Sequence, residues 1–105
     1  MMKVDKHNIV AYLKEIKEEL KLDGISKVAL FGSFAREEES VYSDIDIAIQ
    51  KEKSYLQTRS AYDYFDEITK IKNLIRTKFH RNSDVFDLDS GSSMKETILK
   101  DIIYV

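Results

Sequence analysis

Hydrophobic residues recur along the chain at two spacings, which separate helical from extended segments. Between residues 9 and 20 they recur every three or four positions, which predicts an amphipathic helix capped by Asp5 or Asn8 and ended by Asp23–Gly24. Residues 58–79 repeat this spacing and predict a second, longer helix. Its apolar positions are Ala61, Tyr64, Phe65, Ile68, Ile71, Leu74, Ile75 and Phe79.

Three shorter runs have the composition or the alternation of β-strands. Residues 27–31 form an apolar, β-prone run that ends at Gly32–Ser33. Residues 44–49 alternate strictly, with isoleucines on one face and two aspartates with Ala48 on the other. Residues 84–88 predict a third strand.

The remaining elements complete a small α+β fold, a mixed β-sheet flanked by helices. One or two helical turns are expected at residues 34–39, and Ser93 with Glu96 forms a capping box before a last helix at 94–102. The chain of 105 residues contains no repeat and no linker. We therefore expect one domain, residues 1–105.

Composition narrows the function classes. Hydrophobic residues make up 43% of the chain and charged residues 34%, which is typical of a globular protein. The net charge of −2 gives no electrostatic reason to expect direct nucleic-acid binding. The absence of cysteine excludes disulfides and thiolate metal sites, and no segment has the length and hydropathy of a membrane span or a secretion signal. We expect a cytoplasmic protein that does not bind membranes.

Asp44 and Asp46 are the first candidates for chemistry, because strand alternation places both carboxylates on one face. Two residues of strand rise separate them by about 6 to 7 Å. Burying two carboxylates without a cation costs several kcal/mol, so the pair needs solvent, basic partners or a metal. Oxygen ligands at this spacing suit Mg²⁺, which usually also binds substrate phosphates. A third carboxylate on a neighbouring strand would complete a two-metal site for phosphoryl or nucleotidyl transfer.

The turn at Gly32–Ser33 is the second candidate. A strand that ends in Gly-Ser before a helical turn presents backbone N–H groups and a hydroxyl, which together can hold a phosphate. A Gly-Ser turn alone is most often only a turn, and an Asp-x-Asp alone is most often a solvated strand face. Their succession here, with ten residues between Ser33 and Asp44, is much more specific.

This succession resembles the signature of the minimal nucleotidyltransferases, small members of the DNA polymerase β-like superfamily. The flanking segments "FGSFAR" and "SDIDIAI" are similar too, and "DVFDLDS…MKETILKDIIYV" resembles the family's third-carboxylate strand, loop and closing helix. The resemblance implies a polymerase-β-like catalytic core that uses ATP and two Mg²⁺ ions. In that core Asp44 and Asp46 would ligate the metal ions, and Gly32 and Ser33 would hold the triphosphate.

The resemblance also implies a third catalytic and metal-binding aspartate. Asp84 has the closest spacing to the last predicted helix, and Asp87, on the opposite strand face, is the alternative. Arg36 could contact phosphate or be a surface charge, and Ser43 could orient a carboxylate or only form a turn. The family usually has glycine where this chain has Glu37, the first of three glutamates, which we expect to point outward.

Family members of this size resemble the antitoxin half of toxin–antitoxin pairs, whose partner is a HEPN-domain ribonuclease toxin from an adjacent gene. The implied reaction transfers AMP from ATP to a tyrosine hydroxyl of the toxin. Two alternatives remain: an antitoxin that neutralises its partner only by binding, and a nucleotidyltransferase of small molecules.

A basic stretch near the end of the long predicted helix is not explained by this reaction. Helical spacing spreads its charges, and Asp66 can pair with Lys70. We interpret the stretch as a solvated helix face, with a landing site for an acidic partner as the alternative. Its basic residues are Lys70, Lys72, Arg76, Lys78 and Arg81.

Overall fold

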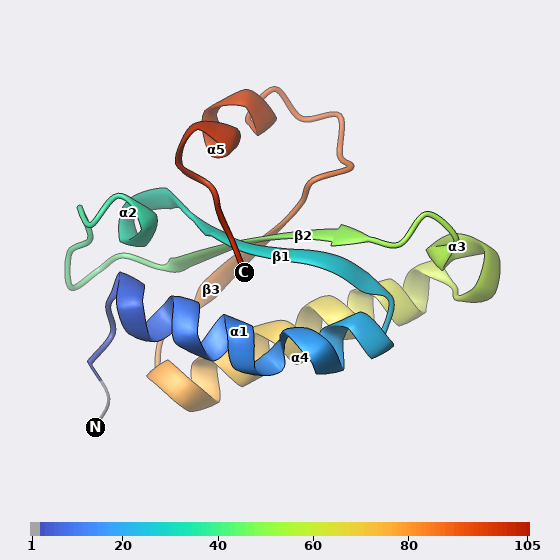
Figure 1. The fold of residues 1–105 in the computed structure, drawn as a ribbon, viewed down its shortest axis with the longest axis horizontal. Helices are drawn as coiled ribbons and strands as arrows, with labels where there is room; N and C mark the ends of the chain where they lie inside the picture. Colours follow the sequence, from blue (N-terminus) through green and yellow to red (C-terminus); the bar gives the residue numbers. More distant parts are fainter. Residues whose placement is uncertain (1–2) are drawn as a thin grey trace.

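The computed structural model describes residues 3–105 as a four-stranded mixed sheet with two long helices on one face (Figure 1). None of the helices in this range is both long and apolar enough to cross a membrane. In chain order the elements are α1 (Lys6–Leu22), β1 (Ile25–Phe31), α2 (Gly32–Ala35), β2 (Ile45–Lys51), α3 (Tyr55–Thr58), α4 (Ala61–Phe79), β3 (Ser83–Asp87), α5 (Lys95–Asp101) and β4 (Ile103–Tyr104).

The sheet has the strand order β3-β2-β1-β4. Strand β1 runs antiparallel to both β2 and β4, whereas β2 and β3 run parallel. A parallel pair needs a long crossover, and here α3 and α4 supply it. The parallel pair therefore brings the start of β3 beside the start of β2, although about forty residues separate them in the chain.

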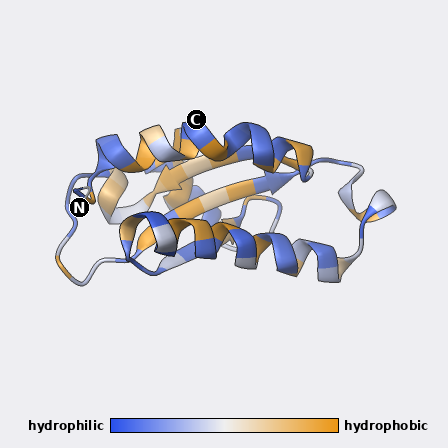
Figure 2. Ribbon diagram, turned by 90° about the horizontal axis from the view of Figure 1, so that it is seen from below, coloured by the Kyte–Doolittle hydropathy of each residue, from blue (hydrophilic) through white to orange (hydrophobic). Residues whose placement is uncertain are grey.

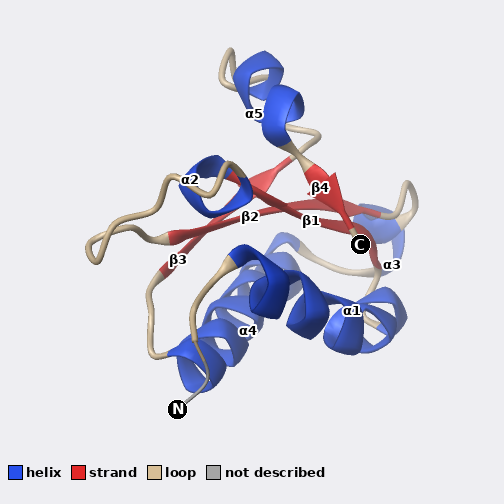
Figure 3. Cartoon of the chain, turned by 60° about the vertical axis from the view of Figure 1, so that its left-hand side comes forward, coloured by secondary structure: helices blue, strands red, loops and turns tan. Residues whose placement is uncertain are grey.

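The predicted α+β fold is confirmed, and the two faces of the sheet differ as the strand alternation predicts. Ile45, Ile47 and Ile49 are fully buried with the apolar residues of α1 and α4. The other face carries Asp46 and Ala48, and Figure 3 shows α2 and α5 on that side of the sheet. In Figure 2 the strands are mostly orange, whereas the two long helices alternate between orange and blue. The large core thus lies between the sheet and one helical layer.

The ends of the two long helices follow local capping chemistry. The Asp5 carboxylate caps α1 by accepting from the Asn8 backbone N–H at 2.9 Å, which decides between the two predicted caps. Ser60 and Asp63 form a capping box at the start of α4. At its other end, His80 adopts the left-handed conformation at φ 55°.

Two local predictions were inexact, and one strand was not predicted. The helix expected at residues 58–79 begins only at Ala61, as α4, because the backbone is extended at Arg59 and Ser60 caps the helix; residue 58 belongs to the preceding short helix α3. The predicted capping box at Ser93 is wrong: α5 begins after Met94, with no side-chain cap. The fourth strand was not predicted: residues 103–104, just beyond the last predicted helix, pair with β1 as strand β4.

Candidate active site

Gly32 lies where β1 turns into the single helical turn α2, and its backbone conformation brings it against Asp46. Its φ of 78° is in the left-handed region that favours glycine. A Cβ at this position would lie 2.9 Å from the Asp46 Cγ, and closer still to a carboxylate oxygen. Ser33 follows, and its carbonyl accepts from the Glu38 N–H at 2.9 Å to close the turn. Only glycine thus leaves room for the carboxylate beside the predicted phosphate-binding turn.

The parallel register places Asp84 directly beside Asp46. Opposite residues on neighbouring strands project from the same face, so both carboxylates lie on the face away from α4. Asp87 instead pairs with Ile49 in the register and accepts from the Lys51 ammonium at 2.8 Å. Of the two aspartates left open by the sequence, Asp84 is the one that the fold brings to the Asp46 side.

Asp44 lies just before β2 and completes a cluster of three acidic side chains. Burial, followed by the negative charges of Asp84 and then Asp44, raises the pKa of Asp46 to about 6, against an ordinary value of 3.8. The positive charge of Arg36 acts in the opposite direction but is outweighed. The site therefore carries more negative charge than its own basic residues can balance.

This donor set fits Mg²⁺ in one specific way. Within residues 3–105, no three acidic or histidine side chains already converge tightly enough to hold an ion by themselves. Mg²⁺ commonly takes one or two carboxylates from the protein and its other oxygens from substrate phosphates and water. The partly buried Asp46, raised in pKa by two neighbouring carboxylates, is a group that a cation would stabilise. Asp44, Asp46 and Asp84 are the residues that would hold it.

Arg36 and Ser43 are near the cluster but have partners of their own. The Arg36 guanidinium lies 3.2 Å from the Asp101 carboxylate of α5 and 3.4 Å from that of Glu38. The Ser43 hydroxyl accepts from the Ser40 N–H at 2.9 Å and so closes the turn before β2. In this structure Arg36 ties α2 to α5, and Ser43 shapes the loop that delivers Asp44.

The three glutamates do not all point outward. Glu37 and Glu38 are exposed and lie near Lys6 and Arg36, respectively. Glu39 is more shielded, and one of its carboxylate oxygens is buried without a hydrogen-bond partner in the described part of the chain. Glu37 has φ 58°, so the backbone is left-handed at the position where the family resemblance implies glycine.

The chain matches a known protein family over most of its length. The family model for polymerase beta nucleotidyltransferases matches residues 14–105. The chain belongs to this family. The solved structure of a candidate minimal nucleotidyltransferase has the same fold, with a TM-score of 0.70, 20% identity and 98% coverage of both chains.

Curated relatives and further structures are consistent with this assignment. Two candidate protein adenylyltransferases from Methanocaldococcus jannaschii are similar: MJ1215 is 39% identical over 62% of this chain and 74% of its own length, and MJ0126 is 32% identical over 88% and 85%. A toxin–antitoxin crystal structure with AMP-PNP has a TM-score of 0.59, at 18% identity and over 96% of this chain and 72% of its own.

Two aromatic side chains that were not predicted as part of the candidate site lie beside the carboxylate cluster. Phe31 lies opposite Asp46 in the register, and Phe86 lies opposite Ala48. Their rings meet edge to face with centroids 6.2 Å apart, on the face that carries the carboxylates. Strand alternation was the available signal, because it places Phe86 on the same face as Asp84.

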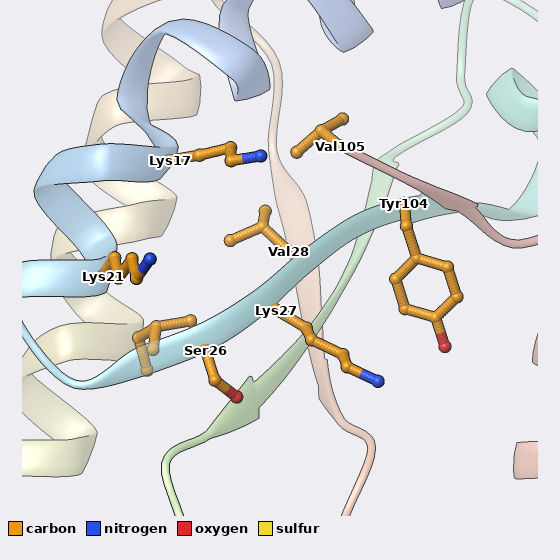
Figure 4. Close-up of a pocket in the computed structure, with 8 residues that line it drawn as sticks. Lys17, Lys21, Ser26, Lys27, Val28, Tyr104 and Val105 are labelled. Carbon is orange, nitrogen blue, oxygen red and sulfur yellow. The ribbon is translucent and has the colours of Figure 1, made fainter.

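Cavities elsewhere on the nucleotidyltransferase are separate from the carboxylates. The cavity in Figure 4, of about 320 Å³, lies between α1 and the strands β1 and β4. It is lined by the basic residues Lys17, Lys21 and Lys27 together with apolar side chains, and by none of the site aspartates. The carboxylate cluster instead lies on the opposite face of the sheet from the main core.

Proposed function

We propose that this nucleotidyltransferase is a Mg²⁺-dependent antitoxin that transfers AMP from ATP to a tyrosine hydroxyl of a HEPN-domain ribonuclease toxin. Its relatives carry the names of candidate protein adenylyltransferases, and it shares its fold with proteins solved as toxin–antitoxin complexes. The observation that best supports transfer chemistry is the register that sets Asp46 beside Asp84, with Gly32 against the same carboxylate.

Each site residue has a role in this reaction. The backbone N–H groups at the start of α2 and the Ser33 hydroxyl would bind the triphosphate and hold its α-phosphorus near the carboxylates. Bound Mg²⁺ would neutralise phosphate charge and favour departure of pyrophosphate. Phe31 and Phe86 would exclude water from one side of the site, which limits hydrolysis of ATP.

The chemical step is an in-line displacement. The tyrosine oxygen forms a bond to the α-phosphorus, the bond from that phosphorus to the bridging oxygen of the β-phosphate breaks, and pyrophosphate leaves. The hydroxyl proton passes to the Asp84 carboxylate, which the register places beside Asp46 and which is exposed to an incoming acceptor. The products are a phosphodiester-linked tyrosyl-AMP and pyrophosphate.

A protein acceptor agrees with the surface next to the site. Val41 and Tyr42 lie in the loop immediately before Asp44, and their exposed fractions are 77% and 90%. Large apolar side chains this exposed beside a catalytic cluster are typical of a surface that a partner covers. A small-molecule substrate would not need them.

A labelling experiment tests the proposal. The protein is incubated with α-³²P-labelled ATP, Mg²⁺ and the HEPN partner, and label on the partner is measured for wild type, Asp46→Asn and the exposed control Asp66→Asn. We expect label with wild type and with the control, and none with Asp46→Asn. If the partner stays unlabelled yet is neutralised equally by Asp46→Asn, the protein acts by binding alone. Label on an added aminoglycoside and not on the partner would favour small-molecule transfer.

A further inference from the structure

The basic stretch at the end of α4 divides into two groups in the structure. Three of its five residues contact other parts of the fold. Lys70 pairs with Asp23 at 2.7 Å, so the pairing predicted with Asp66 is wrong. Lys78 lies over the Tyr12 ring at 5.4 Å, and Arg81 donates to the Ser43 carbonyl at 2.8 Å. The other two, Lys72 and Arg76, project instead toward one shared hollow.

This hollow, of about 330 Å³, lies between α4 and the start of β3. Two of the residues around it are cationic, the other four are neutral and polar, and none is acidic. Arg76 also contacts the side-chain oxygen of Asn82. Its lining residues are Thr69, Lys72, Asn73, Arg76, Asn82 and Ser83.

Ser83 gives the hollow a second, independent feature. Only 8% of this residue is exposed, and its hydroxyl oxygen is buried with no hydrogen-bond partner among residues 3–105. It alternates with Asp84 along β3, so its side chain faces α4 and not the carboxylate cluster. A buried hydroxyl without a partner is costly and uncommon, and it is explained if it donates a hydrogen bond to a ligand oxygen.

We propose that this hollow is a binding site for a phosphate group, separate from the triphosphate site of the transfer reaction. The Lys72 ammonium and the Arg76 guanidinium supply the positive charge, and the Ser83 hydroxyl with the amides of Asn73 and Asn82 supplies neutral donors. Phosphate binding in this hollow is independent of the proposed transfer reaction, because the hollow lies on the opposite face of β3 from Asp84.

The cavity in Figure 4 provides the matched comparison. It is of similar volume and carries three lysines, but it is lined partly by apolar side chains. Its one serine, Ser26, already donates to the Gln50 carbonyl at 3.0 Å. Both cavities therefore carry positive charge. Of the two, only the hollow beside Lys72 and Arg76 also has a buried serine hydroxyl, that of Ser83, without a hydrogen-bond partner.

The test is a titration of the ¹⁵N-labelled protein without Mg²⁺, at constant ionic strength, followed by amide and Arg side-chain resonances. The probes are inorganic phosphate and AMP. We expect saturable shifts at Arg76, Asn82 and Ser83 with at least one probe. Lys72→Gln/Arg76→Gln should weaken binding about tenfold or more, and Ser83→Ala about threefold to tenfold. Lys17→Gln/Lys21→Gln, which removes the same charge from the other cavity, should leave the affinity within about twofold.

Each outcome of the titration either supports or overturns the proposed phosphate site. Saturation by inorganic phosphate identifies a free anion as sufficient, and saturation by AMP alone identifies a phosphate carried on a nucleoside; both support the site. Absence of saturable shifts at these residues overturns it. So does equal weakening by the two double variants, because binding would then reflect net charge only, and so does unchanged affinity in Ser83→Ala. Thermal unfolding of each variant checks that a lost signal is not lost folding.

Discussion

Replacing Asp46 by Asn should make the protein more stable while abolishing nucleotidyl transfer. Burial and two neighbouring carboxylates raise the pKa of Asp46 to about 6 from 3.8, so the folded state disfavours its charge. At 1.36 kcal/mol per pH unit, this difference corresponds to about 3 kcal/mol at pH 7.5 as an upper bound. Asparagine has nearly the same shape and no charge, so we expect a gain of about 1 to 3 kcal/mol in the free energy of unfolding.

The size of this effect depends on pH. Because the pKa of Asp46 is higher in the folded state, the folded state binds more protons between about pH 4 and pH 6. The contribution of Asp46 to the free energy of unfolding therefore decreases as pH rises through this range and then stays level. The stabilisation by Asp46→Asn should accordingly be close to zero at pH 4 and complete by pH 7.5.

Urea denaturation at the two pH values, with a chelator present, measures the difference directly. Asp66→Asn is the matched control, since Asp66 is exposed on α4 and should change stability by no more than about 0.5 kcal/mol. An equal gain at pH 4 and pH 7.5, or no gain at pH 7.5, would refute the assignment of Asp46 as a crowded, partly buried carboxylate.

Three further substitutions test other parts of the site and its frame. Gly32→Ala should destabilise by about 2 kcal/mol or more in urea denaturation, because its Cβ meets Asp46 at φ 78°; unchanged stability would show that the turn rearranges. Glu37→Gly should stabilise by up to about 1 kcal/mol since φ is 58° there, whereas Glu38→Gly, outside the left-handed region, should destabilise; the reverse order would contradict the turn geometry. Burial, and then Asp23, raise the pKa of Glu67 to about 7 from 4.5, so the contribution of Glu67 to stability falls as pH rises between these values. Glu67→Gln should therefore raise the free energy of unfolding by about 1 to 3 kcal/mol at pH 8 and by little at pH 4. Urea denaturation at the two pH values measures the difference.

Much of the fold follows from local patterns that the sequence displays. The helical spacing of the first segment and the Asp23–Gly24 stop match α1 closely, because caps and amphipathic periodicity act within a few residues. The alternation in residues 44–49 correctly separated the buried isoleucine face from the aspartate face. Strand alternation in residues 84–88 likewise placed Asp84 and Asp87 on opposite faces of β3.

Features that depend on pairing between segments far apart in the chain could not be predicted from local sequence patterns. Strand β4 is only two residues long. Residues 102–105, Ile-Ile-Tyr-Val, are β-prone, but so short a run does not show which strand it will pair with, and β4 forms because β1 offers an edge. The contact between Gly32 and Asp46 joins the turn after β1 to β2, and the contact between Phe31 and Phe86 joins β1 to β3. The left-handed backbone at Glu37 has no residue-type signal at all, since glutamate does not favour that conformation.

The register between β2 and β3 determines which of the two aspartates, Asp84 or Asp87, lies beside Asp46. A slip of one residue in β3 would exchange the faces of every side chain and turn Asp84 away from Asp46. Three contacts oppose that slip: the Ile45 N–H donates to the Asn82 carbonyl, the Leu88 N–H donates to the Ile49 carbonyl, and Lys51 pairs with Asp87. These contacts lie at both ends of the paired segment. Asp87, the alternative catalytic aspartate, thus helps to hold the register in which Asp84 meets Asp46, so its substitution should affect the site through the position of β3 and not through loss of a ligand.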